Sequence, residues 1–75
     1  MTPKIGQIWR ITYPTYFRMF GVPHDRDATV YYEEGDKIVL KWVGQHGSIH
    51  FLDQQGREVH MWVDGLHRYA EWISD

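Results

Sequence analysis

Three side chains on one predicted strand are of the types found in catalytic sites. His46, Ser48 and His50 alternate along the chain, so they share one face of an extended strand. A nucleophile and its general base must approach to roughly 2.6–3.2 Å. Residues two apart on a strand stand about 6.5–7 Å apart and project in parallel. With no obvious acidic residue to orient a base, we expect polar residues at a solvated hairpin, no catalytic residue and no enzyme activity.

The histidines also suggest a metal site. His46, His50, His60 and Asp53 offer nitrogen and oxygen ligands of the kind that zinc accepts, but their spacing matches no closed zinc site. The chain has no cysteine, which excludes disulfides and thiolate-bound metals. We therefore predict neither a metal nor a cofactor.

A second polar cluster, His24-Asp25-Arg26-Asp27, lies in the first half of the chain. It could bind a cation or a basic partner, but it lacks the glycine and glutamate spacing of a calcium-binding loop. We interpret it as solvated charge at a loop tip.

Charge and hydropathy narrow the function classes further. The net charge is -2, and the eight Lys and Arg residues are scattered without a run, which argues against binding duplex DNA through a basic stripe. No apolar stretch approaches the roughly 20 residues of a membrane span, and residues 1–11 lack the apolar core of a signal peptide. We expect a cytoplasmic protein with no membrane partner.

Aromatic residues are more numerous than a small core usually holds. They make up 16% of the 75 residues, including four Trp, and each can bury roughly 150–250 Å². A chain of this length forms one domain, residues 1–75, with one small core. Some aromatic side chains should therefore face a ligand or a partner.

Short apolar runs separated by glycine-bearing turns position these residues, and such a pattern is typical of consecutive β-hairpins. The run at 37–43 is followed by the turn Gly44–Gly47, and the run at 48–53 by Asp53-Gln54-Gln55-Gly56, which fits a turn closed by a left-handed glycine. Further strands are expected at 6–13, 57–63 and 69–73, with a returning arm at 30–32. Alternation places inward the apolar residues Ile11, Ile38, Leu40, Ile49, Phe51, Val59, Met61 and Val63.

The segment from Thr15 to Thr29 lacks a clear strand pattern. Its aromatic residues could form one amphipathic turn over residues 16–20, which Gly21 and Pro23 would end. We expect an irregular loop rich in aromatic side chains.

The region from Glu33 to Ile73 resembles the SH3-like small barrels. Glu34-Gly35-Asp36 resembles their diverging turn, Gly56-Arg57-Glu58 the exit of their distal hairpin, and Gly65–Tyr69 the 3₁₀ turn before their last strand. The resemblance implies a mostly β fold: a five-stranded antiparallel barrel with a long aromatic loop after the first strand and a short 3₁₀ turn before the last. The Ala-Leu-Tyr-Asp-Tyr, Trp-pair and Pro-x-x-Tyr motifs of peptide-binding SH3 domains are absent, so the resemblance concerns topology and not ligand.

Two clusters of aromatic residues are candidate binding residues. Those of the long loop either plug an open end of the barrel or form an exposed ledge whose Arg and aromatic composition is typical of interface hot spots. Trp42, Trp62 and Trp72 cannot all lie inside; Trp62 shares a face with His60 and should be partly exposed, whereas Trp42 should pack in the core. The predicted partner-binding residues are Tyr16, Phe17, Arg18, Phe20, Tyr31, Tyr32 and Trp62.

These observations favour a non-catalytic module that binds another protein. Such short single-domain chains are typical of phage or mobile-element accessory proteins, which often inhibit a host factor. The alternative is a nucleotide or single-stranded nucleic-acid binder that stacks bases on aromatic rings, although the chain has no glycine-rich phosphate loop. Uncovered aromatic residues would also favour a homodimer.

Overall fold

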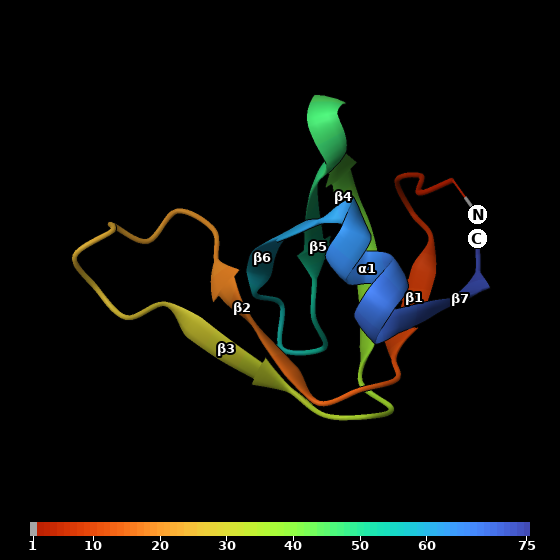
Figure 1. Cartoon of the computed structure of the whole chain (residues 1–75), viewed down its shortest axis with the longest axis horizontal. Helices are drawn as coiled ribbons and strands as arrows, with labels where there is room; N and C mark the ends of the chain where they lie inside the picture. Colours follow the sequence, from red (N-terminus) through yellow and green to blue (C-terminus); the bar gives the residue numbers. More distant parts are fainter. Residues whose placement is uncertain (1) are drawn as a thin grey trace.

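The computed structural model describes residues 2–75, so Met1 of the predicted 1–75 domain lies outside the described part. It is one antiparallel sheet with a single short helix (Figure 1). The elements are β1 (Ile8–Ile11), β2 (Thr15–Met19), β3 (Thr29–Tyr32), β4 (Lys37–Val43), the 3₁₀ turn η1 (Gln45–Gly47), β5 (Ser48–Leu52), β6 (Glu58–Trp62), α1 (Val63–Tyr69) and β7 (Ala70–Ser74).

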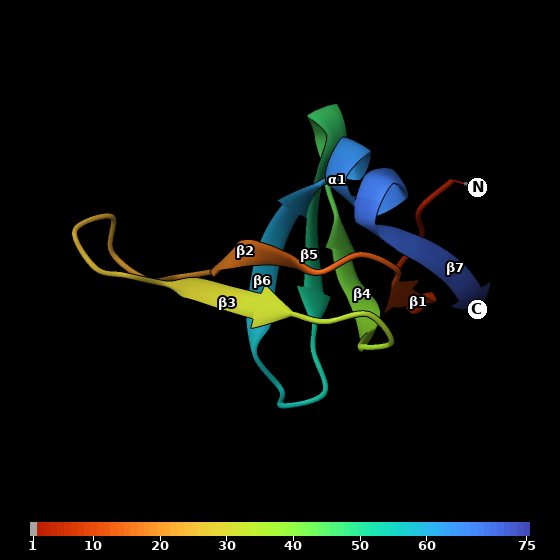
Figure 2. The ribbon, with the colours of Figure 1, turned by 60° about the horizontal axis from the view of Figure 1, so that its bottom comes forward.

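The sheet has seven strands in the order β3-β2-β6-β5-β4-β1-β7 and curls into a half-barrel. A mostly β fold with a curled antiparallel sheet and the meander β4-β5-β6 is therefore confirmed. The predicted count of five strands is wrong, because the segment expected to be irregular contributes β2 and the expected returning arm forms a full strand of the sheet, β3. Figure 2 shows β2 and β3 as a two-stranded arm that extends away from the rest of the sheet.

The arm forms because residues 15–19 alternate with period two, not with the helical period. Tyr16 and Arg18 point outward, while Phe17 and Met19 pack against the core. Both hydrogen-bonding edges of the strand are also paired, since β2 pairs with β3 along one edge and with β6 along the other. The amphipathic turn predicted over residues 16–20 is thus wrong.

The connection before β7 also differs from the prediction. A 3₁₀ turn was expected over residues 65–69, and the structure has an α-helix over Val63–Tyr69. Leu66 is fully buried and Val63 packs against the core cluster, so these apolar side chains hold the helix on the core. Within residues 2–75, no helix has the length and apolar character needed to cross a membrane.

The core lies on the concave side of the sheet. Of the eight residues predicted to point inward, seven are buried; the exception, Val63, begins α1 and is only partly buried. Phe51 is central: its ring lies 5.6 Å from that of Tyr32 and 5.9 Å from that of Phe17, both edge to face. Such aromatic pairs add stability beyond the area they bury.

A buried carboxylate fastens the arm to the turn between β5 and β6. Asp53 accepts hydrogen bonds from the Tyr32 hydroxyl and the Arg57 Nε, both at 2.7 Å, and from the backbone N–H groups of Gln55 and Arg57. Burial raises the pKa of the Asp53 carboxyl, but these hydrogen bonds outweigh it and leave the pKa below its usual value. The turn ends at Gly56 in the predicted left-handed conformation, with φ +80.

A β-bulge in β4 decides the position of one tryptophan. Leu40 pairs with Phe51, but the next register pair joins Trp42 to His50, so Lys41 is an extra residue on β4. A bulge of this kind reverses the alternation beyond it. The core position predicted for Trp42 is therefore wrong: its side chain lies on the outer face and is 44% exposed.

Candidate functional site

Five ring side chains form a continuous strip on the outer, convex face of the sheet. The His50 ring lies 4.3 Å from that of Phe20, 4.9 Å from that of Trp42 and 5.5 Å from that of His60. His60 in turn contacts Trp62 edge to face at 5.0 Å. We call these five residues, Phe20, Trp42, His50, His60 and Trp62, the ring strip.

The strip is assembled by strand register. His50 of β5 pairs directly with His60 of β6, and Trp42 pairs with His50 through the bulge. Cross-strand partners share a face, with their side chains about 4.5–5.5 Å apart at Cβ. Phe20 joins from the end of β2, where its N–H donates to the Glu58 carbonyl at 2.9 Å.

Three of the five rings, those of Phe20, Trp42 and Trp62, are exposed to solvent. Phe20 is 53% exposed and Trp62 is 57% exposed, whereas His50 and His60 are partly buried between them. Single exposed apolar residues are ordinary, but a contiguous group is typical of an interaction site.

Polar contacts fix the two histidines. The Ser48 Oγ and the His60 Nε2 lie 2.9 Å apart, and the His50 Nδ1 lies 2.9 Å from a Glu58 carboxylate oxygen. Lys41 donates to the other Glu58 oxygen at 2.8 Å. The hydrogen bonds from Lys41 and then His50 lower the pKa of Glu58, so the carboxylate stays ionised beside the strip.

A serine does touch a histidine here, but across two strands and not along one strand. Ser48 contacts His60, while the carboxylate of Glu58 is bonded to His50. Among residues 2–75, no carboxylate forms a hydrogen bond with His60, so the pair lacks the third group that orients a general base. In the same range, no group of three or more His, Asp or Glu side chains could hold a metal ion.

The structure divides the seven predicted binding residues into two groups. Tyr32 is buried and Phe17 packs against the core, so these two rings contribute to the core and are not exposed to a partner. Tyr16 and Tyr31 form an exposed pair on the arm with ring centroids 5.9 Å apart. The residues exposed to a partner are Tyr16, Arg18, Phe20, Tyr31 and Trp62; their binding role stays a prediction.

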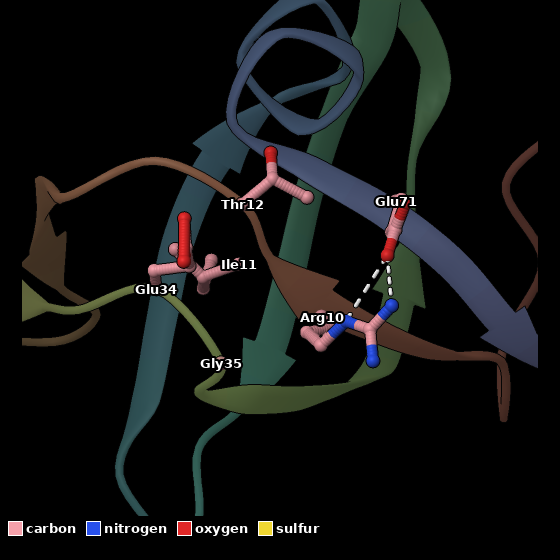
Figure 3. Close-up of a pocket in the computed structure, with 6 residues that line it drawn as sticks. All are labelled: Arg10, Ile11, Thr12, Glu34, Gly35 and Glu71. Carbon is pink, nitrogen blue, oxygen red and sulfur yellow. Dashed lines mark hydrogen bonds and ion pairs between the residues drawn. The ribbon is translucent and has the colours of Figure 1, made fainter.

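Two hollows flank the outer strands. One, of about 410 Å³, lies between β1, β7 and the turn before β4, where the Arg10 guanidinium is held by the Glu71 carboxylate (Figure 3). The other, of about 520 Å³, lies beside β2 and borders the ring strip at Phe20 and His60. The cation of the first hollow is neutralised within the protein, whereas the second adjoins the exposed rings.

Acid is expected to destabilise the protein through His60. Burial, and then the charge of His50, lower the pKa of His60. The unfolded chain, with a histidine pKa of about 6.5, then binds more protons than the folded one, so stability falls as the pH drops from about 6.5 to the folded pKa. NMR titration of the ring protons and urea unfolding at two pH values would measure this. His60→Gln should reduce the pH dependence; a His60 pKa at or above 6.5 would contradict the argument.

Gly44→Ala is expected to move Trp42 without straining the backbone. Gly44 has φ -99, which any residue adopts, but a methyl group there would lie 2.0 Å from the Trp42 indole. The indole is the free end of an exposed side chain, so it should swing off His50 at small cost in stability. Tryptophan fluorescence and near-UV circular dichroism should change, with a melting temperature close to that of the wild type. An unchanged spectrum would show that the indole does not pack on Gly44.

The strip combines residues that the sequence only partly identified. The shared face of His60 and Trp62 and the alternation of Ser48 and His50 were visible, but the contacts of Trp42 and Phe20 depend on the bulge and on β2. Comparison with known proteins gives no further guide: no protein-family model, no curated protein and no solved structure shows a significant match to this chain.

Proposed function

We propose that this chain is a non-catalytic module that binds another protein through the ring strip and the adjoining Tyr16–Tyr31 pair. The observation that supports this most is the unbroken contact from Trp42 to Trp62 across the outer face. Exposed Trp and Tyr side chains with a neighbouring Arg are typical of binding hot spots, because they gain much contact area for little loss of entropy.

Tagged protein and its variants, used to capture partners from a lysate of the source organism, would test the proposal. Trp62→Ala should reduce capture of a specific partner by about 2 kcal/mol or more in binding free energy. Trp72→Ala is the matched control, because this half-exposed tryptophan lies on β7 at the far edge of the sheet. Equal capture by wild type and Trp62→Ala, both folded, would overturn the proposal.

A nucleotide or single-stranded nucleic-acid binder is the second candidate function, because exposed rings on a sheet face can stack bases. The absorbance of the purified protein at 260 nm distinguishes the two candidates. Co-purified nucleotide that Trp62→Ala releases would favour this alternative.

The proposal extends to the cellular location and biological role of the protein. We infer a cytoplasmic accessory protein of a phage or mobile element that inhibits a host factor, built on an SH3-like arrangement of the β4-β5-β6 meander. The Tyr16–Tyr31 pair at the β3 edge could also be covered by a second copy in a homodimer. A strict monomer at high micromolar concentration in sedimentation equilibrium would remove the homodimer.

A further inference from the structure

The hollow beside β2 has a distinctive lining. It is lined by Arg18, Met19 and Phe20 in and just after β2, by the loop over residues 21–24, and by His60 of the ring strip. Its volume of about 520 Å³ lies within the range of small-ligand sites. Most of the lining is apolar, and it includes one permanent cation, the guanidinium of Arg18.

Arg18 is held in place but not neutralised. Its Nη2 donates to the carbonyl oxygens of Val22 at 3.0 Å and Pro23 at 2.8 Å. Within the described residues, Arg18 has no ion-pair partner, whereas Arg10, Lys41 and Arg57 are each paired with a carboxylate. A guanidinium has five N–H donors in a planar fork that matches a carboxylate, so Arg18 keeps donors for a ligand.

The charge of Arg18 affects the pKa of Asp27, but this carboxylate is already hydrogen-bonded to another residue. The Asp27 carboxylate accepts the Thr29 N–H at 3.0 Å. That hydrogen bond and, to a smaller extent, the charge of Arg18 lower the pKa of Asp27. Asp27 therefore feels the field of Arg18 without forming an ion pair with it.

We propose that this hollow receives a carboxylate of the binding partner, with Arg18 as the group that holds it, so that the segment crossing the ring strip is an acidic peptide with an apolar body. The proposal rests on the proposed function, because it names the chemistry of that same partner. Charge complementarity supports it: within residues 2–75 Arg18 has no paired carboxylate, and the carboxylate of Glu58 beside the strip is already bonded to Lys41 and His50.

A peptide fits this face better than a nucleic acid. Single-stranded nucleic acid gains affinity by neutralising several phosphates, but Lys41 beside the strip is already paired with Glu58 and the chain carries a net charge of -2. One anchoring carboxylate needs only one arginine.

Two matched small probes test the proposal without a known partner. Indole-3-acetate and indole-3-acetamide have the same apolar body and differ in the carboxylate. Titrated into ¹⁵N-labelled protein, the acid should shift the backbone amides of Arg18, Gly21 and Val22 and bind at least fivefold more tightly than the amide. Arg18→Gln should reduce this preference below twofold. Arg26→Gln, in the loop that follows β2 but outside the hollow's lining, should retain it.

Several results would overturn the proposal. Equal binding of the acid and the amide to the wild-type protein would do so, even if Arg18→Gln fails to fold. So would an acid preference that survives in folded Arg18→Gln, or tighter binding of an eight-residue oligothymidylate to the same amides. Loss of partner capture in Trp62→Ala with no acid preference would leave the protein-binding function standing and remove only the carboxylate site.

Discussion

Asp53→Ala is expected to lower the free energy of unfolding by about 3 kcal/mol or more, because each buried donor left without its acceptor costs about 1–3 kcal/mol and the carboxylate has several. The Asp53 side chain is 2% exposed and accepts hydrogen bonds from Tyr32, Arg57 and two backbone N–H groups. Without it, the Tyr32 hydroxyl is left buried without its partner. Because domains are stable by only about 5–15 kcal/mol, the variant should be largely unfolded at moderate temperature.

Urea unfolding followed by tryptophan fluorescence would measure this loss. Tyr32→Phe is the matched control: it removes one hydroxyl and leaves Arg57 on the carboxylate, so about 1 to 2 kcal/mol is expected. Because the folded pKa of Asp53 is lowered, its contribution is present above the unfolded pKa of about 3.9 and is lost as the pH falls through the folded pKa. If Asp53→Ala proved milder than Tyr32→Phe, the carboxylate would not be what joins the arm to the turn.

Phe17→Ala and Tyr16→Ala, neighbours on β2, are expected to lower stability by very different amounts. Phe17 contacts Phe51 at 5.9 Å and both Tyr32 and Tyr69 at 6.3 Å between ring centroids. Its removal opens a cavity under the arm and should cost about 3 kcal/mol of stability. Tyr16 is 65% exposed and contacts Tyr31, so its loss should cost less than about 1 kcal/mol.

Thermal melting and partner capture together distinguish these roles. In a domain of this size, each 1 kcal/mol shifts the melting temperature by about 4–8 °C, so Phe17→Ala should melt at least about 8 °C below Tyr16→Ala. Tyr16→Ala should instead weaken partner capture while remaining folded. Similar melting temperatures for the two variants would mean that the arm is not packed as the structure shows.

The sequence by itself determined the strands whose pattern is local. Alternation over residues 37–43, 48–53 and 57–63 identified the meander and six of its inward-facing residues, because a period of two sends every second side chain to one face. Asp53-Gln54-Gln55-Gly56 identified its turn, because a residue with φ +80 there favours glycine. The surplus of aromatic residues indicated an exposed surface without locating it.

Only the tertiary structure decided which aromatic residues meet. Residues 15–19 became a strand because β3 and β6 were there to pair with it, and strand preference depends on such neighbours more than on the local sequence. The bulge at Lys41 moved Trp42 from the core to the outer face. The ring strip and the Arg18 hollow draw on four strands and a loop, so their geometry depends on registers between distant segments, which no local pattern contains.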